Sequence, residues 1–289
     1  MARDPARAFA GRTLCIATMH GKERVVAPLL EARLGVRCVV PPPGFDSDRF
    51  GTFSGDVPRL GTALDAARAK ADAGMTASGT DLAVASEGSF VPHPDAPFLQ
   101  LGAELVLLVD RREHLEIVGE DLTTETNHAR RRCRDLDEIR AFGQRTGFPD
   151  HGLVLVLGDP PQRVHRGLRD LPALTAAVTD LQRAAANRDV PMFVSSDMRA
   201  HHNPTRMRAI ERAAAALATR AATPCPGCAL PGFGQVEVVR GLPCALCGAP
   251  TSWPRAFLHG CARCPTRREL PRPDGRRDVD PGSCPACNP

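Results

Sequence analysis

Eight of the 11 cysteines in this 289-residue chain follow residue 224, and they form four Cys-x-x-Cys pairs. Two thiolates at this spacing grip one tetrahedral metal ion, and two such pairs complete a four-sulfur shell. The sequence therefore predicts two zinc ions. Because a four-sulfur shell leaves no position for water, both ions are expected to be structural rather than catalytic. The predicted ligands are Cys225, Cys228, Cys244, Cys247, Cys261, Cys264, Cys284 and Cys287.

The order of the pairs allows two ways of sharing the ions. If neighbouring pairs share an ion, as Cys225-Cys228 with Cys244-Cys247, the tail forms two zinc ribbons in a row. If alternate pairs share an ion, the tail forms a cross-braced module. We expect the sequential arrangement. Residues 221–289 have little apolar content, so metal binding rather than a conventional core must stabilise this Cys-rich module.

Disulfides and iron–sulfur clusters are the other common uses of cysteines at such spacings. Disulfides need an oxidising compartment, and residues 1–11 lack the apolar run of a secretory signal. An iron–sulfur cluster would also use cysteines, but the regular doublets favour zinc. The thiols therefore indicate a reducing compartment, and we expect a cytoplasmic protein.

Residues 1–220 alternate strand-like and helix-like segments, which predicts one α/β domain. The unit Thr13–Met19, Lys22–Leu34 and Cys38–Val40 is strand–helix–strand and favours parallel pairing. The segment Glu104–Val118 has the pattern of a hairpin. The expected fold is a mixed sheet flanked by helices, followed by a small zinc-ribbon module. Further helices are expected at Thr62–Met75, Leu136–Phe142, Leu171–Ala186 and Thr205–Arg220, and further strands at Leu82–Ala85, Leu153–Leu157 and Met192–Val194.

A polar cluster lies between the first strand and the first helix. It contains Thr18, His20 and Lys22. Free backbone N–H groups at a helix N-terminus attract anions, and Lys22 adds a full charge. The cluster therefore predicts a phosphate site, although an ordinary capped turn would have the same sequence. Only two of the 37 basic residues are lysines, Lys22 and Lys70, and Lys70 lies on an Ala-rich helix.

Two more polar clusters follow predicted strands. Ser86–Ser89 is interpreted as a turn, where Glu87 is placed to hold Mg²⁺ or is an exposed loop acid. Residues 195–206 place many polar side chains between a strand and a helix. Asn203 suits the N-cap of that helix, with Pro204 in its first position. The other polar residues of this cluster are Asp197, Arg199, His201, His202 and Arg206.

The whole chain resembles a bacterial family known as a domain of unknown function. This resemblance rests on five segments that span the sequence from end to end. It carries no activity. The segments are Ile16–Glu23, Phe50-Gly51-Thr52-Phe53, Ala85–Phe90, Asp197–Arg206 and the tail that begins at Cys284.

Residues 1–220 also resemble, in order, the inosine/xanthosine triphosphate pyrophosphatases with their Maf/ITPase-like fold. The matching features are a strand followed by Gly21-Lys22, a helix with Ala67–Ala71, an acid at Glu87, and the hairpin. Gly147-Phe148 before a strand and the basic Arg206 on the last helix, with His201 or His202, complete the match. Met19-His20 replaces the usual Asn, Glu87 stands alone where a pair of acids is usual, and the chain has no Tyr to stack on a base.

The resemblance implies Mg²⁺-assisted attack of water on a nucleoside triphosphate, with release of pyrophosphate. It assigns charge neutralisation to Lys22, Lys70 and Arg206, and metal or water binding to Glu87. A magnesium site would need a second acid, for which Asp48, Asp65 and Asp81 are candidates. The expected catalytic set is Lys22, Lys70, Glu87 and Asp197, and the expected binding set is Thr18, His20, Arg199, His201, Asn203 and Arg206.

The alternative is a nucleic-acid- or protein-binding adaptor in which the zinc module does the work and the α/β part is a scaffold. The tail carries several arginines, including Arg263, Arg267 and Arg268, although acids dilute this charge. A metal-stabilised structural protein is a third option. The net charge of +4 and the four arginines of Ala129–Arg134, expected on a solvated helix or loop face, favour no partner. No apolar run is long enough for a bilayer, so no membrane partner is expected.

Overall fold

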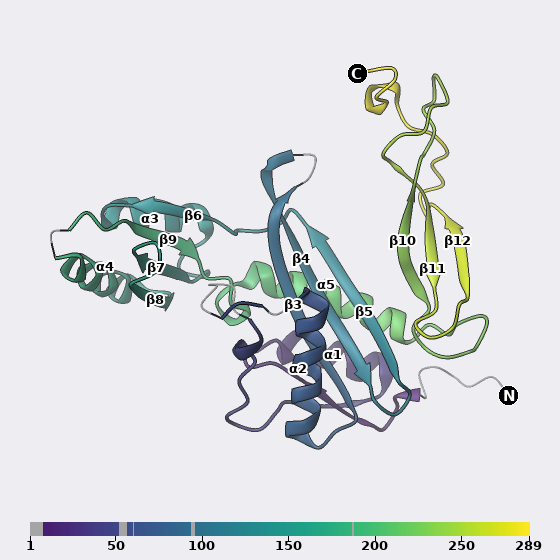
Figure 1. The fold of residues 1–289 in the computed structure, drawn as a ribbon, viewed down its shortest axis with the longest axis horizontal. Coiled ribbons are helices and arrows are strands. Elements are labelled where there is room, and N and C mark those ends of the chain that lie inside the picture. Colours follow the sequence, from purple (N-terminus) through teal and green to yellow (C-terminus); the bar gives the residue numbers. More distant parts are fainter. Residues whose placement is uncertain (1–7, 52–56, 60, 94–95, 187) are drawn as a thin grey trace.

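Three sheets make up the protein in a computed structural model that describes residues 8–51, 57–59, 61–93, 96–186 and 188–289 (Figure 1). The mixed α/β class predicted from the sequence is confirmed. Thr52 and Phe53, which contribute to the family resemblance, lie outside the described residues. No helix in the described ranges is both long enough and apolar enough to cross a membrane.

The first sheet is mixed and has the strand order β2-β1-β3-β4-β5. Strand β1 is parallel to β2 and β3, as the strand–helix–strand pattern predicted, and the following pairs are antiparallel. The predicted hairpin is formed by β4 and β5. The strands are β1 (Thr13–Ile16), β2 (Arg37–Val39), β3 (Leu82–His93), β4 (Ala96–Asp110) and β5 (Leu115–Thr123).

Helices cover both faces of this sheet, because alternate strand residues point to opposite sides. Leu82 and Val84 pack with α1 (Glu23–Leu34) and α5 (Pro204–Ala221). Ala83 and Ala85 pack instead with α2 (Ala63–Ser78). Helix α5 lies very close to β5, since a Cβ built on Gly119 would be 2.3 Å from Leu217 N. The two faces of β3 therefore present their side chains to different helices.

Residues 130–196 form a second, antiparallel sheet with its own core (Figure 1). Its order is β6-β9-β7-β8, and α3 and α4 supply the helical side of the core. The described part of residues 1–220 thus contains two sheets where the sequence predicted one. The elements are β6 (Arg130–Cys133), α3 (Leu136–Thr146), β7 (Leu153–Leu157), β8 (Arg163–Leu168), α4 (Leu171–Ala185) and β9 (Met192–Ser196).

Two expectations about local structure are wrong. Ser86–Ser89 is not a turn but the middle of β3, and Gly88 stands there because a Cβ would lie 2.5 Å from Glu104 Oε1 on the neighbouring strand. The arginine-rich segment predicted as a helix or loop face is the edge strand β6. Strand β8 was not predicted. Edge strands tolerate polar and charged residues, so β6 and β8 lack the apolar pattern used to find strands.

The third sheet belongs to the Cys-rich tail and stands beside the end of α5 (Figure 1). It is an antiparallel sheet of β10 (Gly234–Arg240), β11 (Pro254–Gly260) and β12 (Arg267–Pro271). The end of this sheet next to α5 is attached to the α/β part. Arg220 Nε donates to Gly232 O, and Ala262 packs against the core between the first sheet and helices α1 and α5. The tail is therefore docked on the rest of the chain.

Candidate functional site

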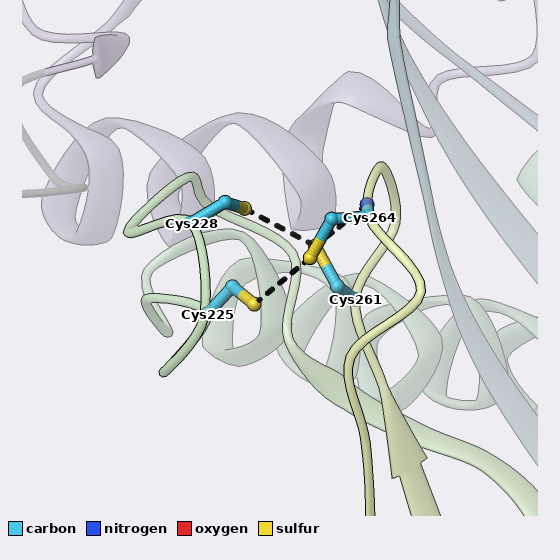
Figure 2. A group of neighbouring side chains, drawn as sticks. All are labelled: Cys225, Cys228, Cys261 and Cys264. Atoms are coloured by element: carbon cyan, nitrogen blue, oxygen red, sulfur yellow. Dashed lines mark hydrogen bonds between the residues drawn. The ribbon is translucent and has the colours of Figure 1, made fainter.

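Four cysteines at the near end of the tail surround one point, as Figure 2 shows. The Sγ atoms of Cys225 and Cys264 are 3.6 Å apart, as are those of Cys228 and Cys261. A Zn–S bond of about 2.3 Å in tetrahedral geometry places sulfurs about 3.8 Å apart, so the cluster fits zinc. Burial raises the pKa of Cys225, but backbone N–H groups of Cys228 and Gly227 outweigh it and lower that pKa to about 6.

A second tetrad has the same geometry at the far end of the tail. Cys244 Sγ lies 3.8 Å from Cys287 Sγ, and Cys247 Sγ lies 3.7 Å from Cys284 Sγ. Alternate pairs therefore share a site, and the sequential arrangement expected from the sequence is wrong. In the described part of the chain, these two tetrads are the only groups of three or more metal-ligating side chains that lie close enough to share an ion.

The tail sheet explains this pairing. In the β10–β11 ladder Gly234 faces Gly260, so the residues before β10 lie beside those after β11. The segment after β10 is at the opposite end, where the Cys244–Val279 bridge brings in the last part of the chain. The antiparallel sheet thus holds the second and third cysteine pairs apart.

A cleft of about 660 Å³ lies between the first and second sheets, and residues of both line it. Strand β1 pairs with β3 only as far as Ile16 and Val84. In the part of the chain that the structure describes, no strand continues β1 beside Ser86, so the edge of β3 opens into the cleft. Seven lining side chains are cationic and three are acidic. Such a surplus of positive charge favours an anionic ligand.

Eight of the ten residues expected in the catalytic and binding sets line this cleft. His201 and Asn203 do not line it. His201 stacks on the ring of His20 at 5.1 Å, and Asn203 is fully buried as the N-cap of α5, where its Nδ2 also donates to Asp197 O. These two residues can position the site but do not face its ligand. The eight are Thr18, His20, Lys22, Lys70, Glu87, Asp197, Arg199 and Arg206.

Lys22 immediately precedes α1 and is buried, with 7% of its surface exposed. Its Nζ lies 2.8 Å from Ser86 Oγ. Burial, together with the nearby positive charges of Arg206 and Lys70, lowers the pKa of Lys22 to about 7, against the opposing effect of Glu104 and Glu87. The amine is therefore near its protonation midpoint at neutral pH.

Stability should rise with pH in a window set by Lys22. Its pKa is about 7 in the folded chain and 10.5 for the ordinary side chain, so between these values the unfolded chain binds more protons. The free energy of unfolding is expected to increase through this window, with a slope approaching about 1.4 kcal/mol per pH unit. Denaturation at a series of pH values, for the natural chain and for Lys22→Met, measures it. An equal slope in both proteins would contradict a depressed amine pKa.

The acidic residues of the cleft are held by cations. Glu87 forms ion pairs with Lys70 through Oε1 and with Arg59 through Oε2, the latter at 2.8 Å. Asp197 accepts hydrogen bonds from Arg199 and from Gly167 N. Although burial raises the pKa of Asp197, the bond to Arg199 lowers it below its ordinary value. Both carboxylates are therefore parts of ion pairs that a ligand could rearrange.

In the wall of the cleft, Arg206 pairs with Glu104, which does not line the cleft itself. Arg206 Nε lies 2.6 Å from Glu104 Oε1, and its guanidinium also donates to Met198 O. The two side chains are 3% and 2% exposed. This buried pair ties α5 to β4, and so fixes the first turn of the helix that follows the Asp197–Asn203 segment.

Sequence reasoning missed several cleft residues. Arg130 and Arg166 lie on the two edge strands β6 and β8, which were not recognised as strands. His128, stacked on Phe90 at 5.0 Å, and Arg59 lie in segments without a regular pattern. Ser86 was noted only as part of a supposed turn. The arginine-rich composition of residues 129–134 was the one available signal.

A resident magnesium ion does not fit these residues. Both oxygens of Glu87 are engaged by cations, and of the three acids considered as its partner only Asp48 lines the cleft. Asp65 accepts hydrogen bonds from Thr62, the N-cap of α2, and Asp81 pairs with Arg12. Within the described residues, no acidic group of three meets the spacing of a metal site.

Comparison with known proteins assigns the chain to a family. A search of the curated proteins found no match. A family model described as "Domain of unknown function (DUF6671)" matches residues 70–289, which include Lys70, Glu87 and Arg206 of the cleft and both cysteine tetrads. Because this match covers more than half of the sequence, the chain belongs to the DUF6671 family, a domain of unknown function.

Proposed function

We propose that the cleft binds and hydrolyses a phosphate-bearing small molecule, and that the substrate is a nucleoside triphosphate from which pyrophosphate is released. The observation that carries the proposal is the meeting of seven cationic side chains from two sheets around one cleft with only three acids. Cations preorganised in a partly enclosed site stabilise the charge that develops during phosphoryl chemistry. The nucleotide rests on the resemblance to the inosine/xanthosine triphosphate pyrophosphatases.

The side chains that line the cleft have different roles in the proposed reaction. Lys22, Lys70 and Arg206 neutralise phosphate charge, and Thr18 and His20 present the turn before α1 to the ligand. Arg199 and its partner Asp197 act from the second sheet. His128 lines the cleft and stacks on Phe90, and its ring could take the place of the missing Tyr. Since the residues do not fit resident magnesium, the cationic side chains are the groups that neutralise the phosphate charge in this proposal.

Lys70→Met is expected to lower the rate of pyrophosphate release by about 100-fold or more, the usual loss when one preorganised donor is removed. The assay supplies a panel of nucleoside triphosphates with and without Mg²⁺. The matched control is Arg68→Ala, because Arg68 lies on the same helix α2 but is exposed and pairs with Glu116. No turnover on any nucleotide, together with no binding of inorganic pyrophosphate, would refute the proposal.

The adaptor remains the second candidate, and one observation favours it. The far end of the tail exposes Leu246, at 74%, and Trp253, with the Arg276 guanidinium 5.6 Å from the Trp253 ring. An aromatic ring beside arginine suits contact with nucleic acid. Salt-sensitive binding of RNA or DNA by the full chain, with no nucleotide turnover, would favour the adaptor. Under either function the two zinc-binding tetrads need a reducing compartment, so we propose a cytoplasmic location.

A further inference from the structure

One contact in the cleft joins the hydroxyl of a serine to the amine of a lysine. Ser86 Oγ lies 2.8 Å from Lys22 Nζ, both residues are 7% exposed, and both line the cleft. When the amine is charged it donates to the hydroxyl. When the amine is neutral the same distance lets the hydroxyl donate to the nitrogen, which is the arrangement of a nucleophile and its base.

We propose that Ser86 is a nucleophile and Lys22 its general base, so that the chain transfers a nucleotidyl group through a covalent nucleotidyl-serine. The choice of a nucleotidyl group rests on the proposed function, in which pyrophosphate is the leaving group. Ser–Lys pairs are a known variant of the Ser–His arrangement, and they are recognised by geometry rather than by sequence position.

The fold places both groups by independent means. Ser86 shares the face of β3 that carries Leu82 and Val84, because residues two apart lie on the same side of a strand. That face is covered by α1, and Lys22 immediately precedes this helix. Glu87 is on the opposite face with Lys70 of α2. The edge of β3 beyond the end of β1 therefore places a hydroxyl and an amine on one side of the cleft wall and an ion pair on the other.

The charges around Lys22 support its role as a base. Arg206 on α5 and Lys70 on α2 disfavour its charged form, while Glu104 on β4 and Glu87 on β3 favour it, and burial decides the balance. The resulting pKa of about 7 leaves a large fraction of neutral amine at physiological pH. The same cations stabilise negative charge on the attacked phosphate.

The step balances without any oxidant or reductant. Ser86 Oγ attacks the α-phosphorus, and its proton passes to Lys22 Nζ. The P–O bond to pyrophosphate breaks with its electron pair going to the leaving oxygen, which takes the proton from Lys22. Water then attacks the nucleotidyl-serine and gives a proton to Lys22. Ser86 Oγ departs and recovers that proton, so one water and one P–O bond are consumed.

The test is labelling of the full zinc-loaded chain with an alkyl fluorophosphonate, which reacts with nucleophilic serines by displacing fluoride and needs no substrate. We expect one adduct by intact mass, located on Ser86 by peptide mass spectrometry. The labelling rate should rise with pH to a plateau above about pH 7, as Lys22 loses its proton. No adduct, or an adduct on another residue, would overturn the proposal.

Variants distinguish a Lys22 that acts as a general base from a Lys22 that supplies only a positive charge. Lys22→Arg keeps the charge but cannot lose its proton, so it should lower the labelling rate at least about 100-fold, as should Ser86→Ala. Ser89→Ala, on the same strand but outside the cleft lining, should label normally. Normal labelling of Lys22→Arg would overturn the assignment. Protection of Ser86 by inorganic pyrophosphate reports separately on the proposed function, which can fail while labelling succeeds.

Discussion

Replacing Cys225 and Cys264 together by serine is expected to remove one of two zinc ions per chain, whereas replacing Cys225 and Cys244 together should remove both. The reason is that Cys225 and Cys264 belong to one tetrad, while Cys244 belongs to the other. A site that loses one thiolate or two loses the same single ion. Elemental analysis of the purified variants measures zinc per chain.

The same experiment distinguishes the two pairings of the cysteines. Sequential pairing would exchange the two results, because Cys225 and Cys244 would then share an ion. Cys38→Ser is the control, since Cys38 lies in β2 and belongs to neither tetrad, and it should keep both ions. Structural zinc contributes on the order of 10 kcal/mol to folding of small modules, so loss of both ions should also unfold the tail. Rapid amide exchange throughout β10–β12 would report that unfolding.

Replacing Arg206 by methionine is expected to lower the free energy of unfolding by about 3–5 kcal/mol, the cost of leaving one partner of a buried ion pair without the other. The Arg206–Glu104 pair is almost completely buried, so Glu104 would lose its charge partner without gaining water. Thermal or chemical unfolding measures the change. This loss of stability is expected whether or not the cleft carries out the proposed reaction.

Two further variants make this result specific. Arg208→Met is the matched control on the same helix, where the pair with Glu125 is more than half exposed and should be worth no more than about 1 kcal/mol. The double variant Arg206→Met with Glu104→Gln should recover much of the loss, because no buried charge remains. A cost for Arg206→Met no larger than that for Arg208→Met would contradict the role assigned to the buried pair.

The helices and the buried strands were predictable because their signals are local. The α5 cap illustrates this: Asn203 accepts from Arg206 N and Pro204 occupies the first position, as the sequence indicated. Strands β6 and β8 were not predictable, since edge strands need only one hydrogen-bonded neighbour and tolerate arginine. The extent of β3 was misjudged at Gly88, where glycine makes room for Glu104 rather than for a turn.

By itself the sequence determined the eight cysteine ligands, the α/β class and the two lysines as candidate site residues, because residue type and short spacing settle these points. The tertiary structure decided which cysteine pairs share a site, since β10 and β11 bring together segments more than 30 residues apart. It also decided that Lys22 meets Ser86 across 64 residues. A pairing over that separation depends on how strands and helices pack, which no local pattern records, and burial by that packing sets the pKa of Lys22.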